Sequence, residues 1–309
     1  MIRIGTRGSA LALAQSTQVQ RRLVNLYPSM QFKLVIIRTA GDEFQSVELF
    51  KKTNVGVFTK AIERELVAKK IDIAVHSLKD LPTKLHPRLA LGAIPKRLDA
   101  ADVLISSKRV TVTQLPLGAF VGTGSPRRKR QLAALRPDLR LVDIRGNLDT
   151  RILKVIKKRE LDAVVVARAG LLRLKKYLKY ARPISPKEML PAVGQAALGI
   201  QIRKSDSKLA QLLKGLHHEP SSIAVNAERA LLEALHGGCR VPLGVYSTIK
   251  NKQLYLKASV FSVRGVGAIT ADITGNPKKP EVVGRALAKK LLKLGAGSFL
   301  KEARREKLS

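Results

Sequence analysis

Five short segments of the sequence combine residue types that bind or react with ligands. They are residues 5–9 (GTRGS), 76–82 (HSLKDLP), 122–130 (GTGSPRRKR), 144–151 (IRGNLDTR) and 236–242 (HGGCRVP). Glycines let the backbone approach a ligand closely, and Arg guanidiniums make paired hydrogen bonds to carboxylates and phosphates. Several such segments in one chain predict a pocket for a ligand that carries more than one negative charge.

The segment 122–130 carries the strongest of these signals. Ser125 suits the N-cap of a helix, Pro126 suits its first turn, and four consecutive cations follow. Cations at a helix N-terminus oppose the helix dipole, so the stability of the helix does not explain them. We expect a bound polyanion to satisfy these cations. A solvated basic face is the alternative.

Two other segments each place an Arg at a turn before a predicted helix. Arg7 precedes Ser9, and Arg145 and Gly146 precede Arg151 by about one and a half helical turns. Each turn has a purely structural interpretation, in which Ser9, for example, is an ordinary N-cap. Together with the Ser125 segment, they predict a shared pocket for carboxylates or phosphates.

Lys79 and Asp80 stand together after a short apolar strand. In a cationic pocket Asp80 would be an anion that accepts hydrogen bonds or moves a proton. In the competing interpretation, Asp80 caps a turn and Lys79 points to water. The sequence leaves both interpretations open.

Cys239 follows two glycines and precedes Arg240. A neighbouring cation stabilises the thiolate form of a cysteine, and glycines leave room for a bulky group at the sulfur. An inert buried cysteine is the usual alternative, and no Cys-His-Asn protease signature accompanies this one. We interpret Cys239 as a site of covalent ligand attachment.

Short apolar strands alternate with helices over the first 200 residues. This pattern predicts two helix-covered, mostly parallel sheets with a ligand cleft between them. Strands are expected at 2–5, 32–38, 71–75, 89–94, 102–106, 119–122, 139–144 and 163–167, and helices at 9–26, 58–69, 125–135, 148–158 and 170–177.

The pattern changes after Pro220. A helix is expected at 223–235, then three antiparallel strands at 241–249, 253–263 and 267–274, then a helix at 280–294. These elements predict a separate, smaller α+β domain at the C-terminus.

Composition limits the possible classes of protein. The 309 residues carry 58 Lys and Arg against 23 Asp and Glu, a formal charge of +35 spread over the whole chain. Such a charge favours anionic partners, although few aromatic residues weaken a single-strand-binding interpretation, and a general compositional habit explains the excess equally well. One cysteine excludes a disulfide framework and a Cys-rich zinc site. With no 18-residue apolar run and no signal-peptide pattern, we expect a cytoplasmic protein and no membrane partner.

Six motifs, in order, resemble the porphobilinogen deaminase family along nearly the whole chain. They are residues 3–12 (RIGTRGSALA), 76–82 (HSLKDLP), 122–128 (GTGSPRR), 145–147 (RGN), 190–197 (LPAVGQAA) and 237–242 (GGCRVP). The resemblance implies a transferase that joins four porphobilinogens head to tail into hydroxymethylbilane, with loss of ammonia from each. The chain would grow on a dipyrromethane cofactor that a thioether holds to Cys239.

The resemblance also implies residue roles. Asp80 would be the catalytic carboxylate, stabilising the azafulvenium cation that forms when ammonia leaves, and no metal is implied. Cofactor-binding positions would be Cys239, Ser77, Lys79, Asp80, Thr123, Ser125, Arg127 and Arg128. Substrate-binding positions would be Arg7, Ser9, Phe58, Arg145, Gly146, Arg151 and Gln195.

The fold that the resemblance implies has two α/β domains with mixed sheets around a cleft, like periplasmic binding proteins, and a smaller α+β domain with a three-stranded antiparallel sheet. Domain 1 would be 1–98 with 196–216, domain 2 would be 99–195, and domain 3 would be 217–309. The elongating chain would occupy the interdomain cleft. A monomer is expected, with its product passed to a uroporphyrinogen-III synthase and no specific nucleic acid partner.

Two positions depart from the family pattern. Val55 stands near where many members carry a loop lysine, and His236 stands where an acidic residue is frequent. The competing function is a non-catalytic two-lobed protein that binds an anionic small molecule.

Overall fold

The computed structural model describes residues 1–38, 59–236, 241–264 and 267–305. The chain divides into two compact units, one of Met1–Leu98 with Ala196–Ser222 and one of Asp99–Gln195 with Ile223–Ser309. The division into three domains at 98, 195 and 216 stays a prediction.

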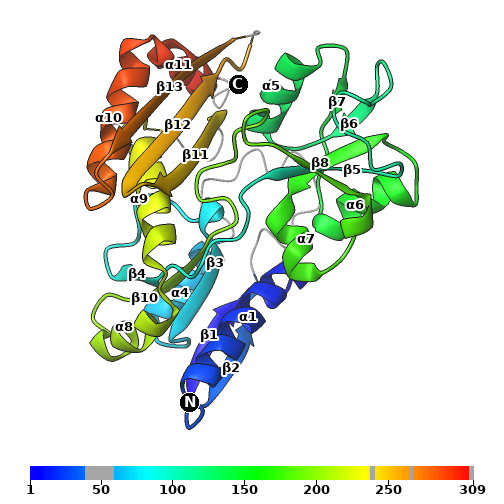
Figure 1. Cartoon of the computed structure of the whole chain (residues 1–309). Coiled ribbons are helices and arrows are strands. Elements are labelled where there is room, and N and C mark those ends of the chain that lie inside the picture. The colour runs from blue at the N-terminus through cyan, green and yellow to red at the C-terminus, as the bar shows by residue number, and fades with distance from the viewer. Residues whose placement is uncertain (39–58, 237–240, 265–266, 306–309) are drawn as a thin grey trace. The chain divides into compact units, whose positions relative to one another are not determined.

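The first unit is built on a mixed five-stranded sheet in the order β2-β1-β3-β10-β4 (Figure 1). β1 is parallel to β2 and β3, whereas β10 is antiparallel to β3 and β4. The strands are β1 (Ile2–Thr6), β2 (Phe32–Ile36), β3 (Ile73–Ser77), β4 (Leu89–Ala93) and β10 (Leu198–Arg203).

Helices cover both faces of this sheet. On one face, α1 (Ala10–Leu26) and α8 (Ser207–Leu213) bury a cluster that includes Val19, Val75 and Ile200. On the other face, α4 (Lys60–Val67) packs Ile62 and Leu66 against the sheet. Because side chains alternate along β3, neighbouring residues of that strand face different helices.

The second unit contains another mixed five-stranded sheet, in the order β7-β6-β8-β5-β9. α5 (Pro126–Leu135) covers one face, and α6 (Leu148–Ile156) and α7 (Arg168–Leu174) cover the other. The strands are β5 (Asp102–Ser106), β6 (Phe120–Gly122), β7 (Arg140–Val142), β8 (Ala163–Ala167) and β9 (Ala181–Ile184).

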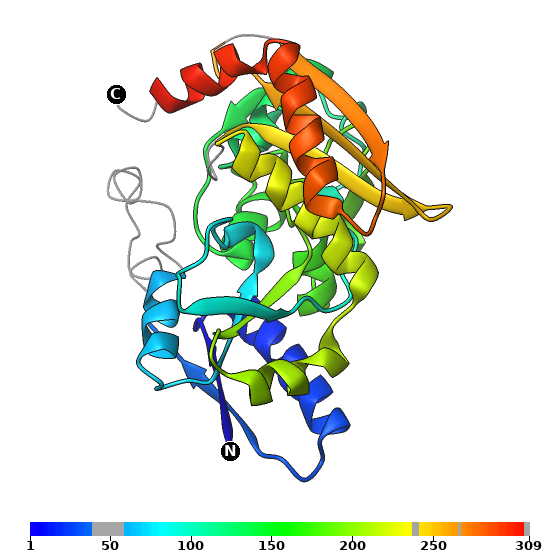
Figure 2. The ribbon, with the colours of Figure 1, turned by 90° about the vertical axis from the view of Figure 1, so that its left-hand side faces the viewer.

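The C-terminal part of the second unit is a three-stranded antiparallel sheet, β11-β12-β13. Its helices pack on one face, where Leu231, Leu287 and Leu300 belong to one buried cluster (Figure 2). The strands are β11 (Leu243–Lys250), β12 (Gln253–Phe261) and β13 (Ala268–Gly275), and the helices are α9 (Glu219–Ala234), α10 (Pro280–Lys293) and α11 (Ala296–Arg305).

The predicted fold class is confirmed: two α/β sheets and a small antiparallel sheet with helices are present. The expectation of mostly parallel sheets holds for four of the five strands in each of these sheets, whereas β10 and β5 each run antiparallel to both of their neighbours. Four elements were not predicted: strands β9 and β10 and helices α8 and α11.

Candidate active site

Asp80 lies in a short 3-10 helix, Leu78–Asp80, that follows β3 directly. It lines a small pocket in the first unit, at the carboxyl ends of the parallel strands β1 and β3, where open α/β sheets place their ligands. The other lining residues are Arg7, Ala12, Gln15, Thr59, Ile62, Val75, His76 and Ser77. The structure therefore brings together three predicted site residues, Arg7, Ser77 and Asp80.

Ser77 is fixed by a helix residue that the sequence did not single out. Gln15 of α1 is buried, its Nε2 donates to Ser77 Oγ at 2.8 Å, and Ser77 Oγ lies 3.2 Å from Gln15 Oε1. Lys79 and Asp80 beside it are exposed. The strand end is thus anchored to α1 while its charged residues remain accessible.

Ser9 is the N-cap of α1, and its hydroxyl accepts a hydrogen bond from the backbone N–H of Ala12 at 3.4 Å. The structural interpretation of Ser9 is therefore correct. Contact of Ser9 with substrate stays a prediction, as does the same role for half-buried Arg7.

His76 is 5% exposed, and its Nε2 lies 3.1 Å from Gln201 Oε1. Burial lowers the pKa of His76 to about 4, and the hydrogen bond to Gln201 only partly opposes this shift. His76 is therefore neutral at physiological pH.

The lowered pKa of His76 predicts that the folded state becomes less stable in acid. This pKa is about 4 when folded and near 6.5 when unfolded, so the unfolded chain binds more protons between these values. We expect the free energy of unfolding to be intact above pH 6.5 and to fall by about 3 kcal/mol as the pH drops to 4. Urea titrations at several pH values measure this slope. His76→Gln, which cannot titrate, should lose that part of the slope, and an unchanged slope would contradict the assignment.

In the second unit, Arg127 and Arg128 lie at the start of α5 and are both buried. Both pair with Asp102, which is fully buried: Arg127 Nη1 lies 2.7 Å from Asp102 Oδ2, and Arg128 Nη2 lies 2.8 Å from Oδ1. Burial would raise the pKa of Asp102, but the two guanidiniums hold it well below its usual range. The cluster carries two positive charges and one negative charge.

Neighbouring groups hold the three charged side chains in place. Arg128 Nη1 donates to Val165 O at 3.1 Å, and Arg127 Nη1 donates to Leu190 O at 2.6 Å. Gln195, 1% exposed, donates from Nε2 to Asp102 Oδ1 at 2.9 Å. Gln195, a predicted substrate-binding residue, thus lies against the cofactor-binding candidates.

Three of the cations of α5 have carboxylate partners within the protein, and contact of these cations with a bound polyanion stays a prediction. Asp102 neutralises part of the charge of Arg127 and Arg128, and Lys129 Nζ lies 2.7 Å from Asp143 Oδ2. Arg127 Nε in this cluster is buried without a hydrogen-bond partner among the described residues.

Asp102→Asn is expected to destabilise the protein by about 3–5 kcal/mol, because it leaves two buried guanidiniums without a counter-charge. Chemical denaturation measures the loss. Asp143→Asn is the matched control. It breaks the ion pair between Asp143, which is 72% exposed, and Lys129 of the same helix α5, and should lower the free energy of unfolding by about 1 kcal/mol or less. Equal effects of the two substitutions would contradict the role of Asp102.

Thr123 and Ser125 shape the turn before α5. Thr123 is fully buried and its hydroxyl accepts from Ser125 N at 3.3 Å, while Ser125 Oγ accepts from Arg128 N at 3.5 Å. Gly124 is required here, because a Cβ at this position would lie 2.8 Å from Ile144 O. Ser125 is the N-cap that the sequence predicts.

The segment 144–151 forms a turn before α6 and the first part of that helix. Gly146 has φ +99°, a conformation that favours glycine, and Arg151 Nε donates to Gly146 O at 2.8 Å. Asn147 is the N-cap of α6 and accepts from Thr150 N at 2.9 Å. Arg145 is half-buried. Substrate binding by Arg145, Gly146 and Arg151 stays a prediction.

Cys239, Phe58 and Val55 lie outside the described residues. His236, which lies shortly before Cys239 in the sequence, is exposed and has φ +48°. Arg304 Nη2 donates to Leu235 O at 3.2 Å and so ties α11 to the end of α9.

Two family models cover most of the chain. Residues 2–211 match "Porphobilinogen deaminase, dipyromethane cofactor binding domain", and residues 222–293 match "Porphobilinogen deaminase, C-terminal domain". The chain belongs to the porphobilinogen deaminase family.

Curated relatives support the same family over nearly the full length. Porphobilinogen deaminase of Moorella thermoacetica is 44% identical over 98% of this chain and 96% of its own, and that of Carboxydothermus hydrogenoformans is 43% identical over 98% and 97%. Among solved structures, the periplasmic VFT2 domain of Bordetella pertussis BvgS aligns with 70% of this chain and 86% of its own, at 14% identity and a TM-score of 0.38. A likeness of that size establishes neither fold nor function.

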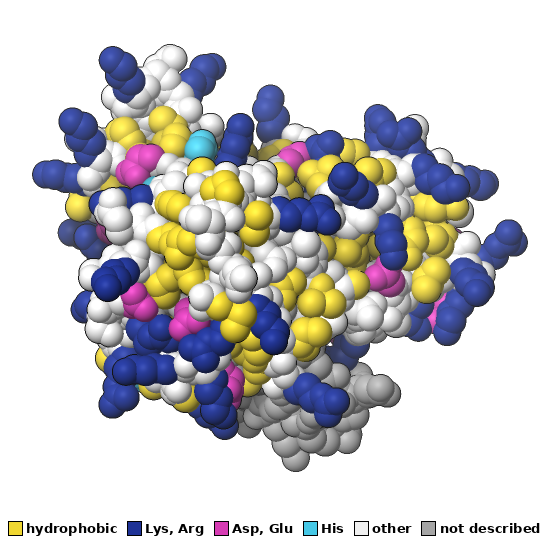
Figure 3. Space-filling view, turned by 90° about the horizontal axis from the view of Figure 1, so that it is seen from below, with side chains coloured by type: hydrophobic (Ala, Val, Ile, Leu, Met, Phe, Trp, Pro, Cys, Tyr) yellow, Lys and Arg dark blue, Asp and Glu magenta, His cyan; other side chains and the backbone are white. Residues whose placement is uncertain are grey.

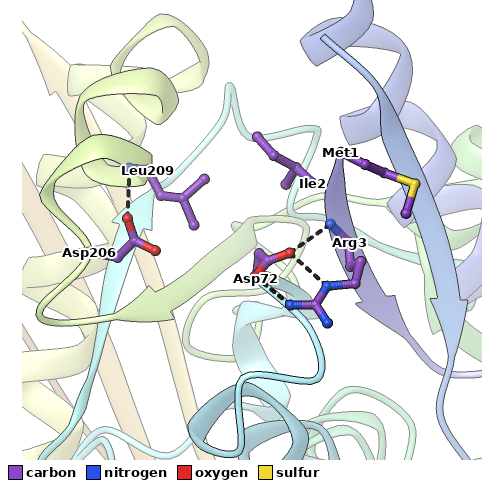
Figure 4. A pocket seen from close by; sticks show the side chains of 6 residues that line it. All are labelled: Met1, Ile2, Arg3, Asp72, Asp206 and Leu209. Atoms are coloured by element: carbon purple, nitrogen blue, oxygen red, sulfur yellow. Dashed lines mark hydrogen bonds and ion pairs between the residues drawn. The ribbon is translucent and has the colours of Figure 1, made fainter.

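A second surface pocket of this porphobilinogen deaminase family member lies at the other end of β1 (Figure 4). There Arg3 Nε lies 2.9 Å from Asp72 Oδ2, and Arg203 Nη2 lies 3.1 Å from Asp72 Oδ1. Partial burial would raise the pKa of Asp72, but hydrogen bonds from both arginines hold it below its usual value. This pocket contains none of the predicted site residues and ties β1, β3 and β10 together.

The remaining positive charge is not gathered at one place on the face that Figure 3 shows. Lys and Arg side chains are scattered over this face. No helix in the described ranges has the length and apolar character needed to cross a membrane. In the same ranges, no three His, Cys, Asp or Glu side chains gather as a metal site requires.

Sequence reasoning missed Gln15, His76 and Asp102, which hold or accompany the predicted residues. Gln15 lies among Ala and Leu in the first helix, and Asp102 begins an otherwise apolar strand (DVLIS). A buried polar side chain requires a hydrogen-bond partner. A polar residue at a position that the hydrophobic pattern predicts to be buried could therefore have indicated these contacts.

Proposed function

We propose that this member of the porphobilinogen deaminase family is a hydroxymethylbilane synthase. It joins four porphobilinogens head to tail, releases ammonia from each, and uses a dipyrromethane cofactor. The observation that carries the proposal is the match of residues 2–211 to the cofactor-binding domain, with Asp80 accessible in a pocket at the strand ends. These findings favour the enzyme over a non-catalytic binding protein.

The residues present fit a dipyrromethane, whose acetate and propionate groups are anions. The Asp102 cluster keeps one excess positive charge, and Arg127 Nε is a buried donor without a partner among the described residues. We assign Arg127, Arg128, Ser125, Thr123, Lys79 and Ser77 to holding these carboxylates and the cofactor backbone. When bound, the cofactor supplies the pyrrole carbon to which the first porphobilinogen is joined.

Asp80 is assigned the catalytic role. Loss of ammonia from porphobilinogen leaves a positive charge on its pyrrole ring, and a nearby carboxylate stabilises that charge and accepts hydrogen bonds from pyrrole N–H groups. The exposed Asp80 beside Arg7 and Ser77 suits this task. Arg7, Ser9, Phe58, Arg145, Gly146, Arg151 and Gln195 are assigned to the carboxylates and ring of the substrate.

Cys239 is assigned the thioether bond to the cofactor. A thiolate attacks the same type of electrophile that the substrate forms, which gives a stable carbon–sulfur bond. We further propose a monomeric, cytoplasmic enzyme whose product passes to a uroporphyrinogen-III synthase.

The test of this function is turnover of porphobilinogen by the purified protein. Four ammonia molecules should appear for each tetrapyrrole formed. Binding of porphobilinogen without ammonia release would instead support the two-lobed binding protein.

A further inference from the structure

His76 lines the same small pocket as Asp80, Arg7 and Ser77, and none of the roles assigned above uses its side chain. It is the residue before Ser77 on β3, so the two side chains point to opposite faces of the sheet. Ser77 faces α1, where it binds Gln15, whereas His76 lies on the α4 face with Ala74. Both faces therefore contribute to the pocket.

A chain of hydrogen bonds fixes the state of the His76 ring. Gln201 Nε2 donates to Glu63 Oε1 at 2.8 Å, so the Oε1 atom of Gln201 faces His76. Because that oxygen is an acceptor, His76 Nε2 carries the proton, and Nδ1 has a free lone pair. In the described part of the chain, Nδ1 makes no hydrogen bond.

In this tautomer Nδ1 is a neutral acceptor atom of a residue that lines the pocket together with Asp80 and Arg7. Burial keeps the ring uncharged at physiological pH, since it lowers the pKa of His76 to about 4. An acceptor without a proton cannot bind a carboxylate, but it suits an ammonium group, which has three N–H donors and no acceptor. Of the groups on porphobilinogen, the aminomethyl group is the cation.

We propose that Nδ1 of His76 accepts a hydrogen bond from the aminomethyl ammonium of porphobilinogen and orients this leaving group beside Asp80. The proposal rests on the proposed function of the Asp80 pocket. In the step itself the C–N bond breaks with its electron pair leaving on nitrogen as ammonia, and the positive charge stays on the pyrrole. His76 gains no proton; it holds the C–N bond in position while Asp80 faces the developing charge.

Two substitutions separate this role from a structural one. In His76→Asn the side-chain amide occupies the position of Nδ1, and in His76→Gln it reaches the position of Nε2 and keeps the contact with Gln201. The holoenzymes are compared for kcat/KM with porphobilinogen and for melting temperature. We expect His76→Gln to lower kcat/KM about tenfold or more and His76→Asn to retain it within about threefold. The reverse order, or equal activity of both variants, would overturn the proposal.

Ligand analogues identify the contacted group. A pyrrole with methyl in place of aminomethyl should bind equally to wild type and His76→Gln, because it lacks the ammonium. Weaker binding of that analogue to the variant would indicate that His76 contacts the pyrrole N–H, and would overturn the assignment of the contact to the ammonium.

A measurement on the wild-type holoenzyme covers the case in which the variants do not fold. An aminoethyl pyrrole, which cannot expel ammonia, should shift the ¹⁵N resonance of His76 Nδ1, and the methyl pyrrole should not. Equal shifts would contradict the proposal. Wild-type turnover in the same preparation reports on the proposed function separately, so an inactive wild type would count against that function and not against His76 alone.

Discussion

Asp80→Asn is expected to fold normally and to lose porphobilinogen turnover by about a hundredfold or more. The substitution keeps the size of the side chain but removes the negative charge that opposes the cation left by ammonia. Asp80 is exposed and follows β3 in a short 3-10 helix, so the fold does not depend on its charge. Ammonia release under single-turnover conditions measures the chemical step directly.

Glu65→Gln is the matched control for this substitution. Glu65 lies on α4 in the same unit and pairs with the mostly exposed Lys70 at 3.4 Å. It also loses one negative charge but is not among the residues that line the Asp80 pocket. Activity should stay near wild type. Near-normal ammonia release by Asp80→Asn, or an equal loss in Glu65→Gln, would contradict the catalytic assignment.

Arg127→Leu is expected to give a folded protein that carries almost no cofactor. The change removes the excess positive charge of the buried cluster and leaves Asp102 paired with Arg128, so the remaining pair is neutral. It also removes the buried Nε donor that we assign to a cofactor carboxylate. Intact-mass measurement should show mostly unmodified chain.

Arg130→Leu controls for the loss of one arginine from α5. Arg130 lies on the same helix, and in contrast to Arg127 it is only half-buried. This variant should carry the cofactor as wild type does. Full cofactor occupancy in folded Arg127→Leu would contradict the assignment of the Asp102 cluster to the cofactor site.

The sequence predicted individual elements better than their partners in space. Asp102–Ser106 and Ala163–Ala167 are strands with the predicted bounds, because continuous apolar runs between turns leave little choice. The order of strands was less accessible. β10 joins the first sheet from about 100 residues further along the chain, and no local pattern reports a pairing of that kind.

In the candidate site, too, the sequence identified individual residues better than the contacts between them. The sequence motifs identified Ser77, Asp80, Arg127 and Arg128, because the types and spacing of these residues suit the predicted chemistry. The side chains that hold them come from distant strands and helices: Asp102 lies 26 residues from Arg128, and Gln15 lies 62 residues from Ser77. Such contacts depend on packing, which the sequence pattern does not specify.

The net charge of +35 illustrates a related limit. Total charge suggested polyanions of any kind, whereas the structure draws attention to one buried cluster with a single excess positive charge. Exposed Lys and Arg are scattered over the face in Figure 3, and nothing in the structure explains their number.

The mass of the intact protein purified after native expression tests the central claim most directly. We expect a chain heavier than its sequence by one dipyrromethane, with the added mass on the peptide that contains Cys239 and absent from Cys239→Ser. An unmodified mass for wild type, or the same added mass in Cys239→Ser, would contradict it.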